Sequence, residues 1–302
     1  MKTAFIFPAF VSEFIGTEIE ILHRFSGDFQ QKLSLATRIT GDNYLGFSLT
    51  DSRFTGDELR SQIISYLFGA SLADELISRG LKPDAVAGYS MGLYAALYGS
   101  GVYHFEDGIR LIEKAFAVSR AAIEKTGCGM GSVIGLTKEE IENIIARAGL
   151  ETTIANVNSE HSHLVTGRKA DINRLLDEAR KIGALNVSFL PVETPYHSHF
   201  LKKTQDEFNR FIREQIPLKE PHYPVISSID QKTIKTTEDV VSEITRNLYE
   251  SLNWENTFKK LLDRGITRFV ECGAGKSLQK ISRFMPGDFK VYPMNKIDKL
   301  IF

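Results

Sequence analysis

The sequence predicts an α/β protein in which a parallel sheet flanked by helices carries a smaller inserted domain. Three observations support this prediction. Short apolar runs alternate with segments of helical periodicity over most of the chain, residues 128–191 have a pattern of their own, and a glycine-flanked serine follows an apolar run. The 302 residues are enough for one large domain or two ordinary ones.

Composition excludes several classes of protein. An apolar content of 42% and a charged content of 25% are ordinary for a globular chain, and a net charge of −1 argues against a dedicated nucleic-acid binder. Two cysteines provide no disulfide framework, so we expect a cytoplasmic protein in a reducing compartment. The start, MKTAFIFPAFV, lacks a small-residue cleavage site, and no apolar stretch is long enough to span a bilayer. We therefore predict no membrane insertion.

The large domain is expected at 1–127 and 192–302. Apolar periodicity and turn residues predict the elements of this domain. Gly80 and Pro83 are expected to end the helix at 57–80. Thr237, followed by two acidic residues, is expected to cap another helix. Strands are predicted at 3–7, 84–87 and within 267–275, and helices at 17–38, 57–80, 91–99, 106–125 and 237–252.

Residues 128–191 are expected to form the inserted domain. Their pattern of strand, helix, two strands, helix and strand is that of a ferredoxin-like βαββαβ unit. Such a unit inserted into an α/β domain creates a cleft between the two, which is a common place for a ligand. The strands are predicted at 129–136, 152–159, 161–167 and 185–192, and the helices at 137–149 and 168–184.

Residues 88–92, Gly-Tyr-Ser-Met-Gly, match the G-x-S-x-G motif between a predicted strand and a predicted helix. The glycines allow a sharp turn that exposes Ser90 beside a helix N-terminus, whose N–H groups suit a developing oxyanion. The motif predicts an α/β-hydrolase-like large domain with a nucleophilic serine. A purely structural glycine turn is the alternative.

A nucleophilic serine needs a base, and the position of the histidines narrows the choice. An ordinary α/β-hydrolase has its histidine late in the chain, but no histidine follows His222. The stretch 190–200, LPVETPYHSHF, lies where the insertion returns to the large domain. Either His197 or His199 could serve, and the residues alone do not choose between them.

The stretch GAGKS at 273–277 is similar to the end of a phosphate-binding P-loop. The first glycine of that motif is missing, because Val270 stands in its place. We therefore do not expect a nucleotide site here.

Taken together, six segments resemble the malonyl-CoA:acyl carrier protein transacylases, the acyltransferases of fatty acid and polyketide synthesis. The resemblance extends over essentially the whole chain. Its segments are FIFP, AGYSMGLYAAL, GVYHFEDGIRLIE, NVNSEHSHLVTG, PYHSHF and ECGAGKSL.

The resemblance implies a Ser-His dyad that needs no carboxylate. Ser90 would accept the acyl group and His197 would be the general base, oriented by a backbone carbonyl at Asn247. The backbone N–H groups of Phe10 and Met91 would form the oxyanion hole. Acyl-CoA and a phosphopantetheinyl acyl carrier protein would be the substrates, with no bound cofactor and no metal.

Two departures from the family pattern affect the walls of the site. The family's P-G-Q-G-S-Q is replaced by residues 8–13, Pro-Ala-Phe-Val-Ser-Glu, which stiffens the loop and removes a glutamine. Tyr89 replaces the usual histidine before the serine, and Leu93 replaces a glutamate. We expect the second change to alter packing only.

The third departure concerns the arginine that the family uses to bind the malonyl carboxylate, whose position is Ala115 here. A buried carboxylate left without such a partner costs about 2–5 kcal/mol. Lys114 points about 100° away around the helix, and Arg120 lies more than a turn further on. His199 could supply a replacement charge or be a polar lining residue. The residues expected to bind substrate are Ala115, Phe116, Met130, Asn158, Ser162 and His199.

The leading expectation is a serine acyltransferase that moves an uncharged acyl group from CoA to an acyl carrier protein. Alternatives are a malonyltransferase with a relocated carboxylate site, a hydrolase that edits acyl carriers, and a non-catalytic scaffold that docks a carrier protein. A basic stretch is expected to be mainly a solvated helix face, with an acidic partner as the alternative. It consists of Lys202, Lys203, Arg210 and Arg213.

Overall fold

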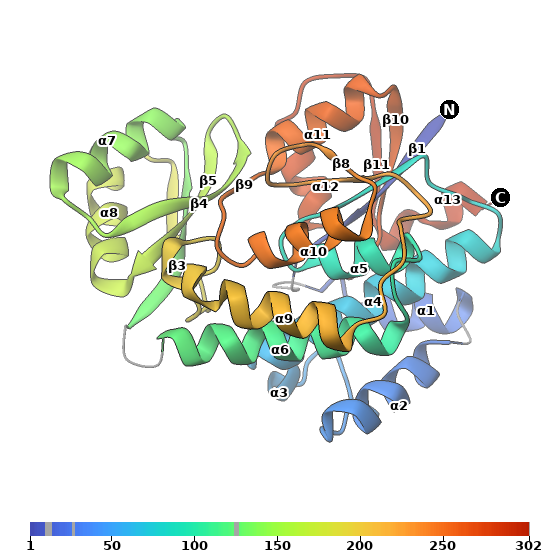
Figure 1. The fold of residues 1–302 in the computed structure, drawn as a ribbon. Helices are drawn as coiled ribbons and strands as arrows, with labels where there is room; N and C mark the ends of the chain where they lie inside the picture. The colour runs from blue at the N-terminus through green and yellow to red at the C-terminus, as the bar shows by residue number, and fades with distance from the viewer. Residues whose placement is uncertain (10–13, 26–27, 124–126, 302) are drawn as a thin grey trace.

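The computed structural model describes residues 1–9, 14–25, 28–123 and 127–301, and two sheets organise them (Figure 1). The larger sheet has the order β11-β10-β1-β2-β7-β8. All neighbouring strands in it are parallel except β7 and β8. Its strands are β1 (Lys2–Phe7), β2 (Ala85–Gly88), β7 (Val225–Ile226), β8 (Thr233–Ile234), β10 (Ile266–Glu271) and β11 (Lys290–Tyr292).

The central strand β1 is buried on both faces, as its continuous apolar run predicts. Phe5 and Phe7 face a core shared with α4 (Glu58–Ser78), α5 (Gly92–Gly99) and α6 (Phe105–Ile123). Ala4 and Ile6 face a second core with α11 (Trp254–Asp263) and α12 (Ser277–Ser282). Helices therefore cover both faces of the sheet, and the α/β fold class is confirmed.

Two predicted helices differ in the structure. The segment 17–38 contains two helices, α1 (Glu18–Phe25) and α2 (Phe29–Thr40), with Asp28 at the start of α2. The segment 237–252 contains only α10 (Thr237–Arg246). The cap of α10 is Thr236 rather than Thr237, because Thr236 and Asp239 form a reciprocal capping box that fixes the start one residue earlier.

The smaller sheet has the order β6-β3-β5-β4-β9. Residues 128–189 supply four of its strands in the predicted βαββαβ order, and these four pair antiparallel. The fifth strand, β9 (Leu252–Asn253), comes from a distant part of the chain and runs parallel to β4. The domain boundaries at 127/128 and 191/192 remain a prediction. The elements are β3 (Cys128–Ile134), α7 (Lys138–Ala148), β4 (Thr152–Ser159), β5 (Ser162–Arg168), α8 (Lys169–Lys181) and β6 (Asn186–Phe189).

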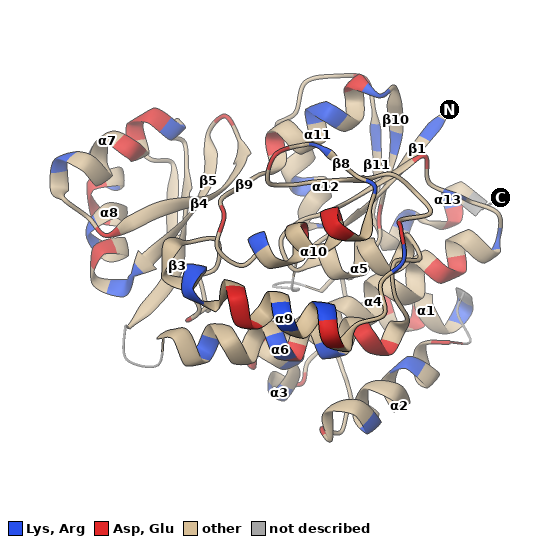
Figure 2. Cartoon of the chain, viewed as in Figure 1, with Lys and Arg blue, Asp and Glu red and all other residues tan. Residues whose placement is uncertain are grey.

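Charged residues of both signs are interleaved on the outer helices (Figure 2). Lys114 on α6 lies 2.5 Å from Glu207 on α9, and Arg213 on α9 pairs with Glu238 on α10. This mixture agrees with a solvated face for α9. None of the helices in the described ranges has the length and apolar character to cross a bilayer. The remaining elements are α3 (Ser52–Thr55), η1 (His199–Thr204), α9 (Gln205–Gln215), η2 (Met294–Lys296) and α13 (Asp298–Ile301).

Candidate active site

Ser90 lies in a tight turn between β2 and α5, as the glycine spacing predicts. Its φ angle of 54° is in the left-handed region, which is strained for a residue with a side chain. A Cβ atom on Gly88 would lie 2.3 Å from the backbone of Leu93, and one on Gly92 would lie 2.1 Å from the carbonyl oxygen of Phe7. Only glycine fits at either position, so the turn is built around the half-buried serine.

His197 meets Ser90 across a distance of 2.8 Å between Nε2 and Oγ. The histidine follows β6 in the chain and also has a positive φ, of 60°. Its backbone N–H donates to the carbonyl of Leu248 at 2.8 Å, which fixes the loop against the end of α10. Of the two histidines that the sequence offered, the structure brings only His197 to the serine.

Burial lowers the pKa of the His197 imidazole from 6.5 to about 4. Backbone groups of Glu250 and Asn247 lie near the imidazole and raise its pKa, but less than burial lowers it. The Nδ1 atom itself makes no hydrogen bond to a described residue. The side-chain Nδ2 of Asn247 donates to the Ser90 carbonyl at 3.3 Å. The imidazole is therefore neutral at pH 7 and can accept the serine proton.

The backbone N–H of Met91 lies directly after Ser90 at the N-cap of α5. It donates to no other residue within the described ranges. A free N–H at a helix N-terminus favours negative charge on an approaching oxygen. Phe10, the other expected donor, lies outside the described residues.

A cleft of about 180 Å³ opens over the serine, and we call it the Ser90 cleft. None of its described lining residues is Asp, Glu, Lys or Arg. It can therefore hold an apolar group beside a nucleophile and a neutral base. The lining residues are Ala9, Tyr89, Ser90, Met91, Met130, Asn156, Leu164, Leu190, Pro191, Tyr196, His197, Ser277, Leu278 and Ile281.

Comparison with known families identifies the kind of protein that carries this site. A family model described as "Acyl transferase domain" matches residues 61–283, which include both Ser90 and His197. The chain belongs to the acyl transferase family. This acyltransferase is also similar over nearly its whole length to individual transacylases.

A malonyl CoA-acyl carrier protein transacylase of Staphylococcus aureus is 26% identical over 307 residues, which cover 98% of this chain and 96% of the relative. The same enzyme of Haemophilus influenzae is 28% identical over 219 residues, 72% of this chain and 70% of the relative. The solved transacylase of Coxiella burnetii superposes with a TM-score of 0.91 at 24% identity, covering 100% and 97% of the two chains. The resemblance inferred from motifs is confirmed.

Only one of the residues expected to bind substrate, Met130, lines the Ser90 cleft of this acyltransferase. Ala115 is 2% exposed and packs in the core beneath α6, and Phe116 beside it is half-buried. Lys114 turns away from the cleft toward Glu207. These contacts agree with the expectation that Lys114 does not replace the missing arginine.

The other three expected residues lie outside the lining of the Ser90 cleft, and their roles remain predictions. Asn158 accepts a hydrogen bond of 2.7 Å from the Tyr89 hydroxyl, behind the cleft wall. Ser162 pairs with Ile134 at the start of β5. His199 is exposed, and its Nε2 lies 3.9 Å from a carboxylate oxygen of Glu151.

Sequence reasoning missed much of the apolar wall of the acyltransferase cleft. Leu164 and Leu190 belong to β5 and to the segment after β6, so each reaches the serine only through the tertiary fold. Tyr196 is the neighbour of His197 in the sequence, and this position could have indicated that it lines the cleft. Its hydroxyl accepts a hydrogen bond of 3.0 Å from Gln62 on α4.

The turn at 273–277 is occupied by carboxylates of the protein itself. Glu271 accepts hydrogen bonds from the backbone N–H groups of Leu278 at 2.9 Å and Gln279 at 3.0 Å. Glu18 accepts one from Gly275 at 3.1 Å. A phosphate cannot use these three N–H groups, because they are already bonded, and the expectation of no nucleotide site stays a prediction. Among the residues described, no three His, Cys, Asp or Glu side chains cluster as metal ligands.

Proposed function

We propose that this acyltransferase moves an uncharged acyl group from CoA to the phosphopantetheine thiol of an acyl carrier protein. The observation that carries the proposal is the 2.8 Å contact between Ser90 and a neutral His197 at the floor of a cleft without charged described lining residues. The serine and the base supply the chemistry, and the apolar wall accommodates the acyl group.

In the first half-reaction, the Oγ of Ser90 attacks the thioester carbonyl while Nε2 of His197 takes the serine proton. The carbonyl oxygen becomes an oxyanion that the Met91 N–H stabilises. The tetrahedral intermediate collapses, the C–S bond breaks, and the leaving CoA sulfur takes the proton from His197. In the second half-reaction the carrier thiol gives its proton to His197 and its sulfur attacks the ester carbonyl. The C–O bond to Ser90 then breaks, and the leaving Oγ takes the proton from His197.

The preference for an uncharged acyl group rests on electrostatics. A malonyl group would bring a carboxylate into the Ser90 cleft, where no described lining side chain is cationic. An unpaired buried carboxylate is strongly destabilising. The malonyltransferase alternative is favoured by the names of the relatives, and it would need a cation outside the described lining.

A carrier protein as the acceptor is supported by the fold of a solved complex. A type II polyketide acyl carrier protein bound to its malonyl-transacylase contains a chain that superposes with a TM-score of 0.91 at 23% identity. In this chain, Lys280 lies on α12, and Lys276 and Arg283 flank the helix; Lys276 and Lys280 are next in sequence to the cleft residues Ser277 and Ile281. Cations on this helix suit the phosphate of a phosphopantetheine arm.

The test is intact-protein mass spectrometry after separate incubation with malonyl-CoA, acetyl-CoA and hexanoyl-CoA, with Ser90→Ala as the control. We expect an acetyl or hexanoyl adduct that Ser90→Ala abolishes, and no malonyl adduct. A malonyl adduct would overturn the substrate preference. It would make Lys276, next to the cleft, the first candidate for the carboxylate partner.

The fate of the adduct separates transfer from hydrolysis and from scaffolding. When a holo-carrier protein is added, a transferase passes the acyl mass to the carrier, whereas a hydrolase loses it to water at the same rate with or without the carrier. A protein that never forms an adduct but still binds the carrier would be a scaffold. We expect transfer.

A further inference from the structure

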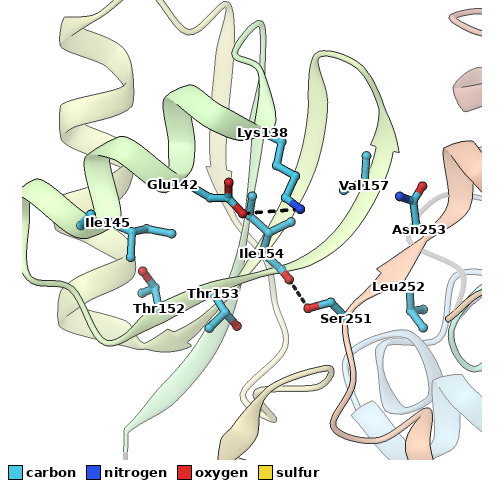
Figure 3. Close-up of a pocket in the computed structure, with 11 residues that line it drawn as sticks. Lys138, Glu142, Ile145, Thr152, Thr153, Ile154, Val157, Ser251, Leu252 and Asn253 are labelled. Atoms are coloured by element: carbon cyan, nitrogen blue, oxygen red, sulfur yellow. Dashed lines mark hydrogen bonds and ion pairs between the residues drawn. The ribbon is translucent and has the colours of Figure 1, made fainter. Parts of the chain in front are cut away.

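A second hollow, of about 470 Å³, lies between α7, β4 and β9 (Figure 3). It shares no lining residue with the Ser90 cleft among the residues described. We call it the Lys138 hollow. Its lining residues are Lys138, Glu142, Ile145, Ala146, Thr152, Thr153, Ile154, Val157, Ser251, Leu252 and Asn253.

Two hydroxyl groups in the wall of the Lys138 hollow lack a hydrogen-bond partner among the described residues. Thr152 is 4% exposed, and its Oγ1 makes no hydrogen bond to a described residue. The Oγ1 of Thr153 is also buried and makes no hydrogen bond to these residues. A buried hydroxyl without a partner is destabilising. Both hydroxyl oxygens are buried in the wall, and a rotation of either side chain about χ1 would turn its hydroxyl toward a polar ligand atom in the hollow.

The charged pair at the hollow can exchange partners easily. Lys138 Nζ lies 3.5 Å from Glu142 Oε1, and both side chains are more than half exposed. Figure 3 shows the ammonium and the carboxylate meeting over Ile154. An exposed pair one helical turn apart contributes little to stability. A ligand carboxylate can therefore take the place of Glu142 beside Lys138.

Apart from Ser251 and Asn253, the rest of the wall is aliphatic, with side chains from α7, β4 and β9. Ile145, Ile154, Val157 and Leu252 supply a surface for a short hydrocarbon chain. A cation, free hydroxyl groups and an aliphatic wall together fit one chemical class. We propose that the Lys138 hollow binds an alkanoate, a free monocarboxylate with a short aliphatic chain.

The hollow is physically joined to the residues around Ser90. Ser251 Oγ donates to the Ile154 carbonyl at 2.6 Å, and the next two residues pair with β4 as β9. A few residues earlier, the carbonyl of Leu248 holds the backbone of His197. A ligand that changes the position of 251–253 therefore acts on the segment that supports the base. Occupancy is expected to change the rate of Ser90 acylation, and this part of the inference rests on the proposed function.

Binding is tested on the Ser90→Ala protein, which cannot be acylated at position 90, by isothermal titration with hexanoate, hexanamide and hexylamine. We expect hexanoate to bind, and Lys138→Met to weaken its binding at least tenfold. Glu142→Gln removes the competing carboxylate and is expected to tighten binding. Lys181→Met is the matched control, because Lys181 forms a similar exposed pair with Glu178 at 2.7 Å on α8. It should leave binding unchanged.

Three binding results would overturn the proposal. These are no hexanoate binding, equal binding of hexanoate and hexanamide, and tighter binding of hexylamine, which would assign the site to a cation at Glu142. Loss of binding in Lys181→Met as well would mean that overall charge, rather than the hollow, attracts the anion. Circular dichroism of each variant excludes loss of the fold.

The regulatory part is tested by the rate of Ser90 acylation with and without hexanoate. An effect in the active protein that disappears in Lys138→Met supports coupling through the hollow. An equal effect in both proteins means that hexanoate competes in the Ser90 cleft, which overturns the coupling. If the active protein forms no adduct at all, the proposed function fails, but the binding result on Ser90→Ala still decides the site.

Discussion

Lowering the pH from 8 to 6 tests the role proposed for His197 as the general base. The imidazole must be neutral to accept the Ser90 proton, and burial lowers its pKa from 6.5 to about 4. Activity that depends on the neutral form is therefore lost only when the pH falls toward 4. Over the range from 6 to 8, we expect the rate of acylation to be nearly constant.

The size of the expected difference follows from the two pKa values. With a pKa of about 4, the neutral fraction of the imidazole is about 99% at pH 6 and essentially complete at pH 8. With the ordinary value of 6.5, about a quarter of the imidazole would be neutral at pH 6. The ratio of the rates at pH 6 and pH 8 is thus near one for the buried base and about one quarter for an ordinary histidine.

The assay is rapid-quench intact-mass measurement of the acyl-Ser90 adduct from hexanoyl-CoA at subsaturating concentration, because this condition reports the free protein. His197→Ala should form almost no adduct at either pH, and circular dichroism checks that the fold persists at pH 6. A fourfold slower reaction at pH 6 in the folded protein would refute the argument from burial. It would mean that water reaches the imidazole.

Three further predictions concern stability and geometry. Gly92→Ala forces a Cβ atom to within 2.1 Å of the Phe7 carbonyl oxygen, and we expect a loss of several kcal/mol in the free energy of unfolding by urea. Asn247→Ala removes the 3.3 Å bond to the Ser90 carbonyl and should cost about 1 kcal/mol and slow acylation. His163 is fully buried, and burial lowers its pKa from 6.5 to about 4. As the pH falls below 6.5, the unfolded chain therefore takes up a proton at this imidazole while the folded protein does not, and this favours unfolding. His163→Leu should therefore reduce the loss of stability between pH 7 and pH 5 by about 2 kcal/mol.

The Gly92→Ala prediction has a control within the chain, and each of the three predictions has an outcome that would contradict it. Gly46→Ala places its Cβ 3.8 Å from the nearest side chain and should change stability by less than about 0.5 kcal/mol. If Gly92→Ala is equally mild, the turn is less crowded than described. Normal acylation by Asn247→Ala would remove that residue from the positioning of the serine. An unchanged pH dependence in His163→Leu would contradict a buried neutral imidazole.

Local sequence patterns predicted the serine turn well, but they could not predict the pairing of strands that are far apart in the chain. The spacing of Gly88, Ser90 and Gly92 is a local property, and the structure shows why each glycine is required. The two-residue strand β9 has no periodicity to read, and it pairs with β4, which is far away in the chain. The predicted helix 237–252 was too long, because α10 ends at Arg246 and the chain then turns toward β9, which begins at Leu252.

The walls of the Ser90 cleft were harder to predict than its floor. The residues alone did not choose between His197 and His199, which stand in the same short stretch. The family resemblance favoured His197, and it is the one that reaches the serine in the structure. Leu164 and Leu190 look like ordinary core residues in the sequence. A motif identifies reacting atoms through their spacing, whereas the shape around them depends on how separate elements pack.

The pairing of β9 with β4 limits how the smaller sheet could be exchanged between related enzymes. A hybrid made by cutting at the ends of residues 128–191 would leave Leu252 and Asn253 from one parent against a strand from the other. The mismatch would fall next to the loop that carries His197. A successful graft must therefore transfer residues 251–253 together with the insertion, as two separate stretches of the gene.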